Sequence, residues 1–336
     1  MIINIQIFFI ILACCVAGLL YYQKVALRNT ITSSPNFRTL HHGDKPTGGG
    51  ITFSTIFVCA AFFFWLTKHI SDEIFFILGV GGFFATFLGF LDDLYNITAI
   101  KKLSCHILLA MWSIYWLNVG LFTGIEWLPS FISVGLAVVF LVWVINAYNF
   151  IDGIDGLAAS AAFFVFGGLI LVMVLSNKTS ELTVLYFSLL ACATGFILFN
   201  WPPAKIFMGD SGSIFLGYVV GSLILMTIER GEVSIWTWFV IFGYFFADTT
   251  VTQTMRLIIV KKWYKAHRSH AYQNLARMSK SHLKVTSGIA IYHLVWLLPL
   301  TIWTIKQPNF SIFAAALAVF PAMLFALKYG PLASSS

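Results

Sequence analysis

The sequence predicts an all-α polytopic integral membrane protein, and three observations carry this prediction. Apolar residues make up 59% of the 336 residues and charged residues only 10%, whereas a soluble domain carries about 25% charged residues. The apolar residues gather in runs long enough to span a bilayer. The basic residues fall mainly in alternate gaps between those runs, which is typical of a chain that crosses a membrane repeatedly.

About eleven transmembrane helices are predicted, because a spanning helix needs ~20 mainly apolar residues. The candidate runs are 2–22, 49–67, 74–91, 102–120, 129–148, 157–175, 182–200, 214–229, 235–255, 285–305 and 310–328. The first run has no basic segment before it and no A-x-A-like cleavage site, so we interpret it as a retained helix. Residues 1–336 are therefore predicted to form one all-helical transmembrane domain.

The basic residues predict the orientation. With the N-terminus outside and the C-terminus inside, only Lys68, Lys178, Arg230 and Lys306 of the 20 Lys and Arg residues lie on the external side. This asymmetry is the one that the positive-inside rule describes. It also accounts for the net charge of +7 without a nucleic-acid partner.

This orientation separates the two kinds of acid. The acids near the cytoplasmic face are all aspartates: Asp44, Asp92, Asp93, Asp152, Asp155, Asp210 and Asp248. Five of the six external acids are glutamates: Asp72, Glu73, Glu126, Glu181, Glu229 and Glu232. Short carboxylates gathered at one membrane face predict an active site there, with a hard cation such as Mg²⁺. The cytoplasmic segments expected to build it are 23–48, 92–101, 149–156, 200–213 and 256–284.

Paired aspartates lie in "FLGFLDDLYNITAIKKL", at the inner end of the third run. Asp92 and Asp93 point about 100° apart on a helix, so they need not bind one ion together. Two like charges this close can raise one pKa, which suits a general base. The alternative is a helix terminus followed by a turn that ends at Lys101 and Lys102.

Two amides and two carboxylates recur at three-residue spacing in "NAYNFIDGIDGL", as Asn146, Asn149, Asp152 and Asp155. They share one side if the helix continues or tightens toward 3₁₀ geometry. Two glycines between them allow a turn and a close approach of ligand to backbone. An EF-hand is excluded because its final glutamate is missing. A simple turn between two helices remains the alternative.

A third polar segment, "FNWPPAKIFMGDSGS", opens with Asn200 and leads through Phe207 to Asp210. The glycines beside Asp210 are expected to leave backbone N–H groups open at a helix N-terminus, which attracts anions. A carboxylate next to such N–H groups suits a metal–phosphate site. As a helix cap alone, Asp210 would be unremarkable.

Two basic segments complete the pattern. "HHGDKPTGGG" combines Lys45 with three glycines, which suits a diphosphate but is not a Walker A loop, because the lysine precedes the glycines. "KKWYKAHRSHAYQ" contains His267, Arg268 and His270, for which phosphate contact is favoured over zinc binding. A basic loop and an amphipathic helix at the membrane surface are the alternatives.

Together these stretches resemble the polyprenyl-phosphate N-acetylhexosamine-1-phosphate transferases (glycosyltransferase family 4) over about residues 38–280. The most specific match is "NAYNFIDGIDGL", supported by Asp92-Asp93, "FMGDSGS", "KPTGGG" and "HRSH". The resemblance implies that a UDP-N-acetyl amino sugar donates its sugar 1-phosphate to undecaprenyl phosphate, which releases UMP. It also implies Mg²⁺, with Mn²⁺ as a substitute, and a single multi-pass catalytic domain, residues 1–336, in a bacterial inner membrane. A homodimer stays open.

The resemblance also implies roles for particular residues. Asp210 would be the metal ligand, Asp92 the base or the partner of the lipid phosphate, and Asp93 its support, so these three are the expected catalytic residues. The expected substrate-binding residues are Lys45, Asn146, Asn149, Asp152, Asp155, Asn200, Phe207, His267, Arg268 and His270. Among these, Asn149, Asp152 and Asp155 would hold the nucleotide, with Phe207 near uracil.

The late motif reads H-R-S-H rather than the three consecutive histidines of the phospho-MurNAc-pentapeptide translocases. This departure favours the branch that initiates O-antigen (lipopolysaccharide) or other surface polysaccharides, and it leaves the sugar undecided. An Mg²⁺-dependent intramembrane prenyltransferase is the alternative enzyme, and it would release pyrophosphate instead of UMP. An ion-coupled transporter would need acids at mid-membrane depth, which the apolar runs lack.

Overall fold

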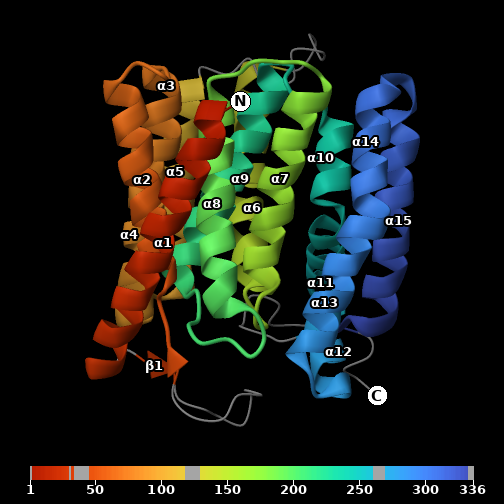
Figure 1. Cartoon of the computed structure of the whole chain (residues 1–336). Helices are drawn as coiled ribbons and strands as arrows, with labels where there is room; N and C mark the ends of the chain where they lie inside the picture. The colour runs from red at the N-terminus through yellow and green to blue at the C-terminus, as the bar shows by residue number, and fades with distance from the viewer. Residues whose placement is uncertain (1, 30–31, 34–44, 118–128, 260–268, 332–336) are drawn as a thin grey trace.

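The computed structural model describes residues 2–29, 32–33, 45–117, 129–259 and 269–331. Within these residues the chain is a bundle of roughly parallel and antiparallel helices (Figure 1). The helices are α1 (Ile2–Arg28), α2 (Gly50–Leu66), α3 (Asp72–Ile74), α4 (Gly82–Tyr95), α5 (Ala99–Leu117), α6 (Ser130–Ile151), α7 (Leu157–Leu175), α8 (Leu182–Asn200), α9 (Asp210–Glu229), α10 (Ile235–Ile241), α11 (Gly243–Ile259), α12 (Ala271–Ser279), α13 (His282–Tyr292), α14 (Leu298–Lys306) and α15 (Ser311–Tyr329).

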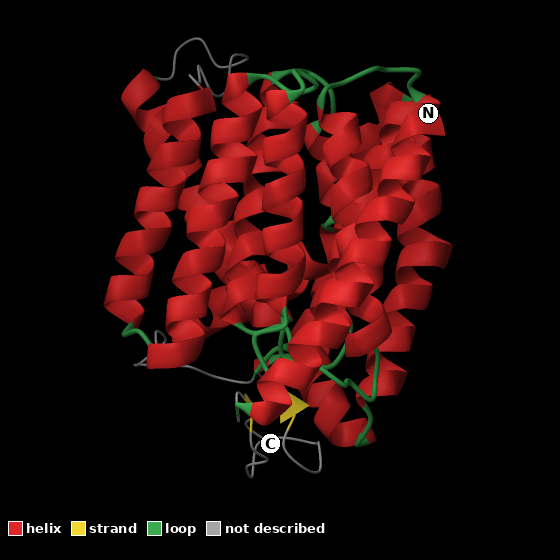
Figure 2. Cartoon of the chain, turned by 60° about the vertical axis from the view of Figure 1, so that its left-hand side comes forward, coloured by secondary structure: helices red, strands yellow, loops and turns green. Residues whose placement is uncertain are grey.

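Short irregular elements join or flank these helices. The π-helix Phe75–Gly81 connects α3 to α4, and the π-helix His293–Leu297 connects α13 to α14. A 3₁₀ turn, Pro308–Phe310, precedes α15. The strands β1 (Thr32–Ser33) and β2 (Lys45–Pro46) pair antiparallel at the lower end of the bundle, as Figure 2 shows. The all-α class is therefore confirmed.

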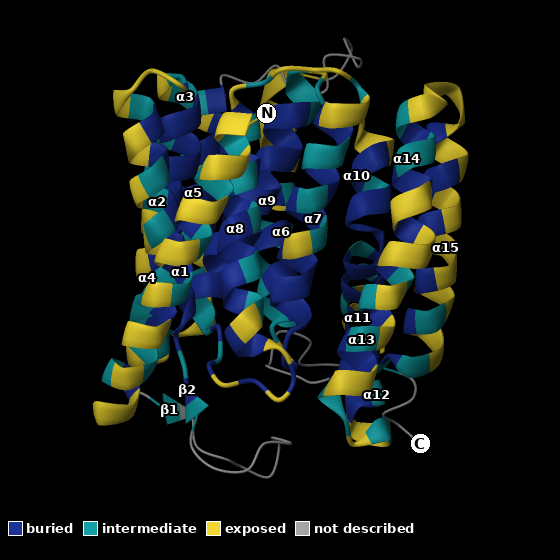
Figure 3. Ribbon diagram, viewed as in Figure 1, coloured by how far each residue is buried: buried dark blue, intermediate teal, exposed yellow. Residues whose placement is uncertain are grey.

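Eight helical rods in the described residues are long and apolar enough to cross a membrane: 2–28, 72–95, 130–151, 157–175, 182–200, 210–229, 282–306 and 308–329. Three further segments, α2, α5 and the stacked pair α10–α11, coincide with the remaining predicted runs. The number eleven and the N-out orientation stay predictions. Large apolar side chains on the outer helices are exposed, as a lipid-facing surface requires (Figure 3).

The two ends of the bundle carry different acids. At the end opposite the aspartates, Arg230 pairs with Glu73 at 3.2 Å, and the Ser71 N–H donates to Glu181 at 2.8 Å. Ser180 donates to Glu232 at the same end. The predicted separation of the acids is thus confirmed for these residues, whereas Asp44 and Glu126 lie outside the described residues.

The central helix is α9, in which every residue from 211 to 227 is buried. It packs against α2, α4, α5 and α6. Its G-x-x-x-G spacing, Gly217 and Gly221, faces α6: an added Cβ at Gly217 would lie 2.7 Å from the Ile145 Cα. Small residues at this spacing let two helix backbones approach closely in lipid.

A second close approach brings α4 onto the beginning of α9. A Cβ at Gly89 would lie 2.2 Å from the carbonyl oxygen of Asp210, so only glycine fits there. Because Gly89 lies one turn before Asp92, this contact places the paired aspartates of α4 beside Asp210. The candidate site therefore depends on helix packing rather than on a long loop.

Candidate active site

An ammonium group lies between two carboxylates at the lower end of the bundle. Lys102, in the first turn of α5, donates to Asp210 Oδ2 at 2.8 Å and also forms an ion pair with Asp92 Oδ2. Asp92 is 5% exposed, and its Oδ1 accepts from the Ile97 N–H at 2.7 Å. Three helices thus meet at one cation flanked by two acids.

The neighbouring Asp93 has a different position. Its two carboxylate oxygens accept from the backbone N–H groups of Asp210 at 2.8 Å and Ser211 at 3.0 Å. These are N–H groups that a helix leaves without an intrahelical partner, and a negative charge at this end is favourable. The expectation that N–H groups beside Asp210 stay open for an anion is therefore wrong for these two, because Asp93 occupies them.

The two amides of α6 diverge. Asn149 donates to Asp210 Oδ1 at 2.7 Å and to Ser213 Oγ at 3.0 Å, so it belongs to the acid cluster. Asn146 lies one turn deeper and contacts His106 of α5 at 3.3 Å and the Val142 carbonyl at 2.7 Å. The structure therefore brings Asn149 to Asp210 and places Asn146 one helical turn farther from the acids, toward the middle of the bundle.

Helix α6 ends at Ile151, so both aspartates of the motif lie in the turn 152–156. Burial, together with the charges of Asp210, Asp93 and Asp155, raises the pKa of Asp152 well above its usual range. Burial also acts on Asp155, but hydrogen bonds from His282 and from the Ala204 N–H outweigh it and lower the pKa of Asp155. Of these two aspartates, only Asp152 has a pKa that the neighbouring carboxylates help to raise.

Asp155 and Asn200 hold the turn to its surroundings. Asp155 accepts from the Ala204 N–H at 2.9 Å and lies 3.0 Å from His282 Nδ1. Asn200 accepts from the Gly156 N–H at 2.9 Å and donates to the Ile206 carbonyl at 2.9 Å. The side-chain groups of both residues are engaged within the protein, and their assignment to substrate stays a prediction.

The two glycines of this turn differ in burial, since Gly153 is exposed and Gly156 is buried. A Cβ at Gly153 would lie 2.4 Å from Gln273 Nε2, and Gly156, with φ +77°, approaches Pro202. Their expected role in letting a ligand approach the backbone stays a prediction. Their use in the turn is confirmed.

The segment around Lys45 lies beside the acids. The Lys45 ammonium is 5.5 Å from the centre of the Phe207 ring, and the Phe207 N–H donates to the Pro46 carbonyl at 2.8 Å. Next to them, an added Cβ at Gly209 would lie 2.9 Å from the Gly48 Cα and 2.7 Å from Asp93. A cation and an aromatic ring thus form one edge of the cluster.

His270 is fully buried, and its Nδ1 lies 3.1 Å from Asp248 Oδ2. Its ring centre is 5.4 Å from that of Phe150, which connects α12 to the end of α6. His267 and Arg268, which were expected to contact phosphate, lie outside the described residues. The roles of all three toward substrate stay predictions.

Two residues of this region were not among the expected site residues. Lys102 was attributed only to a loop and to membrane orientation, and His282 only to a basic segment. The sequence held a signal for Lys102, because this lysine follows the paired aspartates closely. A tight turn between them reverses the chain and can bring the ammonium back to the carboxylates. No such signal existed for His282, which lies more than a hundred residues from its partner Asp155.

Opposite effects on stability are expected for the two aspartates of the turn. Because the pKa of Asp152 is raised in the folded state, folding becomes less favourable as the pH rises above ~4, where the unfolded carboxyl ionises. Asp152→Asn should therefore raise Tm by a few degrees near pH 7 without substrate or Mg²⁺. Asp155 has a lowered pKa, so its contribution is present above about pH 4 and is lost as the pH falls through its folded value.

Asp155→Asn serves as the matched variant and should lower Tm near pH 7. Thermal unfolding of the detergent-solubilised protein, followed by tryptophan fluorescence from pH 4 to pH 8, checks both expectations. A lower Tm for Asp152→Asn than for the wild type at pH 7 would contradict the placement of Asp152 among like charges.

The donor set can be tested against a bound metal ion. Among the described residues, no group of three or more His, Cys, Asp or Glu side chains is arranged to hold a metal by itself. Mg²⁺ usually takes only one or two carboxylates and completes its shell with water and substrate phosphates. Asp92 and Asp210 fit such an ion because both supply hard oxygen ligands. Their two negative charges also exceed the single positive charge of Lys102.

Comparison with known proteins identifies relatives that match two thirds or more of the chain. Residues 75–228 match the family model "Glycosyl transferase family 4". A probable undecaprenyl-phosphate N-acetylglucosaminyl 1-phosphate transferase of Bacillus subtilis is 27% identical over 90% of this chain and 84% of its own. Phospho-N-acetylmuramoyl-pentapeptide-transferases of Prochlorococcus marinus (strain MIT 9301) and Fervidobacterium nodosum are 31% and 30% identical, over 69% and 73% of this chain and 70% and 76% of theirs. A multi-pass protein of the bacterial inner membrane is consistent with these relatives and with the apolar helices.

Proposed function

The chain belongs to glycosyl transferase family 4, and we propose that it transfers an N-acetylated amino-sugar 1-phosphate from a UDP-sugar to undecaprenyl phosphate. The observation that carries the proposal is the convergence of Asp92, Lys102 and Asp210 from three helices, with Asn149 from a fourth. Phosphoryl transfer depends on positioned charge more than on covalent chemistry. A cluster of acids around one ammonium, at the end of a membrane bundle, suits a charged reaction on a lipid headgroup.

The transfer balances as a single displacement at phosphorus. An oxygen of the lipid phosphate attacks the phosphorus that bears the sugar, and a P–O bond to the lipid forms. The bond from that phosphorus to the bridging oxygen breaks, and UMP leaves with that oxygen. The products are a lipid-diphospho-sugar and UMP.

The residues of the cluster divide the work. Asp92 would take the proton of the lipid phosphate, and the Lys102 ammonium would steady the charge that develops on the phosphoryl oxygens. Asp93 positions Asp210 through the first N–H groups of α9. Asp210 and Asp92 would hold Mg²⁺, which would supply positive charge to neutralise the diphosphate.

The nucleotide would lie along the edge formed by Lys45 and Phe207. The Phe207 ring could stack on uracil while the Lys45 ammonium reaches the diphosphate. The ammonium lies 5.5 Å from the centre of the ring. Asn149 and Asp152, at the end of α6, offer an amide and a carboxylate on the adjoining side. Four other expected substrate-binding residues contact protein groups instead: Asn146, Asp155, Asn200 and His270. They would hold the residues of this edge in position rather than contact the nucleotide.

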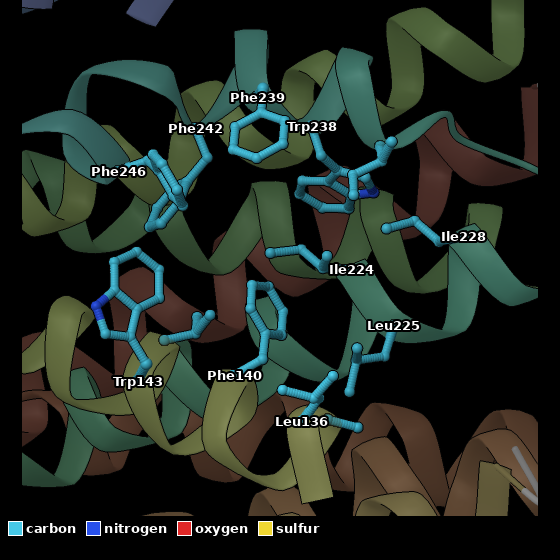
Figure 4. A pocket seen from close by; sticks show the side chains of 13 residues that line it. Leu136, Phe140, Trp143, Ile224, Leu225, Ile228, Trp238, Phe239, Phe242 and Phe246 are labelled. Carbon is cyan, nitrogen blue, oxygen red and sulfur yellow. The ribbon is translucent and has the colours of Figure 1, made fainter. Parts of the chain in front are cut away.

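The acceptor's hydrocarbon chain requires an apolar path above the acids. A cavity of about 290 Å³ lies between α6, α9, α10 and α11, and it is lined by Phe140, Trp143, Ile224, Phe242 and other apolar side chains (Figure 4). Trp143 precedes Asn149 by six residues of α6, or ~9 Å at 1.5 Å per residue. Part of a prenyl chain in this cavity would leave its phosphate close to Asp210.

The pathway assignment rests on two features. The relatives' names divide between N-acetylglucosaminyl 1-phosphate and phospho-N-acetylmuramoyl-pentapeptide transfer. The H-R-S-H motif of this chain favours a role in initiating O-antigen or another surface polysaccharide. An N-acetylated hexosamine is the expected sugar.

One assay tests the proposed function. Purified protein is incubated with undecaprenyl phosphate, Mg²⁺ and each of a panel of UDP-N-acetyl amino sugars, and UMP and the lipid product are quantified by chromatography. Equal amounts of UMP and lipid-diphospho-sugar are expected with at least one sugar. Absence of UMP with every sugar would contradict the proposal, and release of pyrophosphate from a prenyl diphosphate would support the prenyltransferase instead.

A further inference from the structure

A second cavity lies between α11, α12, α13 and α15, and none of its lining residues belongs to the acid cluster. Its volume is about 550 Å³, and it is open on one side. Most of its lining is apolar, with Val285, Ile289 and Phe325 among the side chains, whereas Ser279 and Lys284 lie where α12 ends and α13 begins. The cavity thus has an apolar body and one polar, basic corner.

The basic corner belongs to a wider positive region. Lys280 and Lys284 are exposed, and Lys328 lies in the last turn of α15 at the same end of the bundle. Within the described residues of these four helices the only acid is Asp248, which is 1% exposed and contacts His270. No described carboxylate on these helices is therefore exposed to balance the lysines at the cavity.

The lipid acceptor of the proposed reaction does not suit this cavity. None of its lining residues belongs to α4, α5, α6 or α9, which carry Asp92, Lys102, Asn149 and Asp210. A phosphate held at Lys284 would therefore lie on a different set of helices from the reacting groups. This arrangement suits a lipid that is not consumed in the reaction.

We propose that this cavity binds one anionic phospholipid, with an acyl chain in the apolar body and the phosphate at Lys284 and Ser279. Basic pockets between helices near a membrane face recognise such headgroups, and each lysine contributes about 1 kcal/mol. The acyl chain would pack against the apolar lining through van der Waals contacts.

The site has a physical connection to the active-site turn. Ser279 and Leu275 line the cavity from α12, and on the same helix the Tyr272 hydroxyl donates to the Phe150 carbonyl. On α13, Thr286 follows the cavity residue Val285 and donates to the Asp155 carbonyl at 2.7 Å. A lipid that holds α12 against α13 therefore also stabilises the turn 152–156.

Two substitutions test the site without touching the catalytic cluster. Lys284→Gln removes the charge from an exposed side chain, and Gly288→Phe fills the cavity, because a Cβ at Gly288 meets no atom within 4 Å. Their matched controls are Lys24→Gln, an exposed lysine of α1, and Gly135→Phe, an exposed glycine of α6 that also has open space.

Native mass spectrometry of delipidated protein, titrated with phosphatidylglycerol or phosphatidylcholine, measures binding. We expect one phosphatidylglycerol per chain, bound more tightly than phosphatidylcholine. Lys284→Gln should weaken this binding about fivefold, as the loss of one lysine implies, and Gly288→Phe should abolish it. Both controls should bind as the wild type does, and all four variants should retain cooperative thermal unfolding.

Three results would overturn the proposal. Equal affinity for the two phospholipids would remove the role of charge, and wild-type binding by both cavity variants would place the lipid elsewhere. Displacement of phosphatidylglycerol by an equimolar amount of undecaprenyl phosphate would assign the cavity to the acceptor instead. None of these measurements depends on turnover, so failure of the proposed enzyme activity leaves this test intact.

Discussion

Asp210→Asn is expected to lower kcat about 1,000-fold or more, while the protein still inserts and unfolds cooperatively. Asparagine keeps the size of the side chain and its contact with Asn149, but it removes the charge that pairs with Lys102 at 2.8 Å. Loss of one preorganised electrostatic group at a reacting centre costs a factor of about 100 to 1,000. If Asp210 holds Mg²⁺ as proposed, its loss as a ligand would add to this, since the diphosphate would then lack that counter-charge. Release of UMP under saturating substrates measures the effect.

The control for Asp210 is Glu229, the acid at the other end of the same helix. Glu229→Gln changes the charge of α9 equally but lies far from Asp92 and Lys102, so it should keep kcat within about twofold, as for surface changes in general. A similar loss in both variants would indicate a general effect of α9 charge on the fold. Full activity of Asp210→Asn would refute the assignment of Asp210 to the reaction.

Lys102→Met is expected to lower kcat/KM about 100-fold or more and to lower stability as well. The ammonium bridges Asp92 and Asp210, so its removal leaves two carboxylates facing each other without a shared partner. Removing one partner of a buried ion pair destabilises by about 3–5 kcal/mol, and partial exposure of Lys102 reduces that figure here. Lys102→Arg keeps the charge and should restore most of the stability but only part of the rate, because its planar group places the charge differently.

Adjacent Lys101 provides the matched control, because its side chain is exposed and pairs with no described acid. Lys101→Met should leave kcat/KM within about twofold of the wild type, as expected of a surface lysine. Kinetics and thermal unfolding are measured on both variants in the same detergent. Equal losses at the two lysines would mean that net charge at this end, rather than the Lys102 bridge, supports activity.

Much of this architecture follows from local properties of the chain. Apolar length decides which segments enter the bilayer, because backbone groups there must be satisfied within helices. The order of apolar runs also decides which polar gaps lie at the same end of the bundle. The glutamates could therefore be assigned to one end, and every aspartate except Asp72 to the other, before any contact was known. Asp92, Asn149 and Asp210 were identified in this way, and their association is borne out by the described contacts.

Identical residue types in one motif nevertheless take different positions. Asp92 pairs with a lysine, whereas Asp93 caps a helix, because two adjacent helical residues face directions about 100° apart. Asp152 lies among like charges, whereas Asp155 bonds to His282 and to the Ala204 N–H, although both lie in the turn that follows α6. The two members of each pair are the same residue type in the same motif, so the sequence could not predict that they would have different partners.

The sequence by itself therefore determined the membrane class, the apolar runs, the end of the bundle at which the acids gather and most of the residue types of the site. Only the tertiary structure decided which acids share a cation, which acids accept from backbone N–H groups and where the apolar cavities lie. The physical reason is that transfer into a bilayer depends on composition over a single helix. Pairing depends instead on atoms from several helices, and here it requires the close approach of α4 to α9 that Gly89 allows.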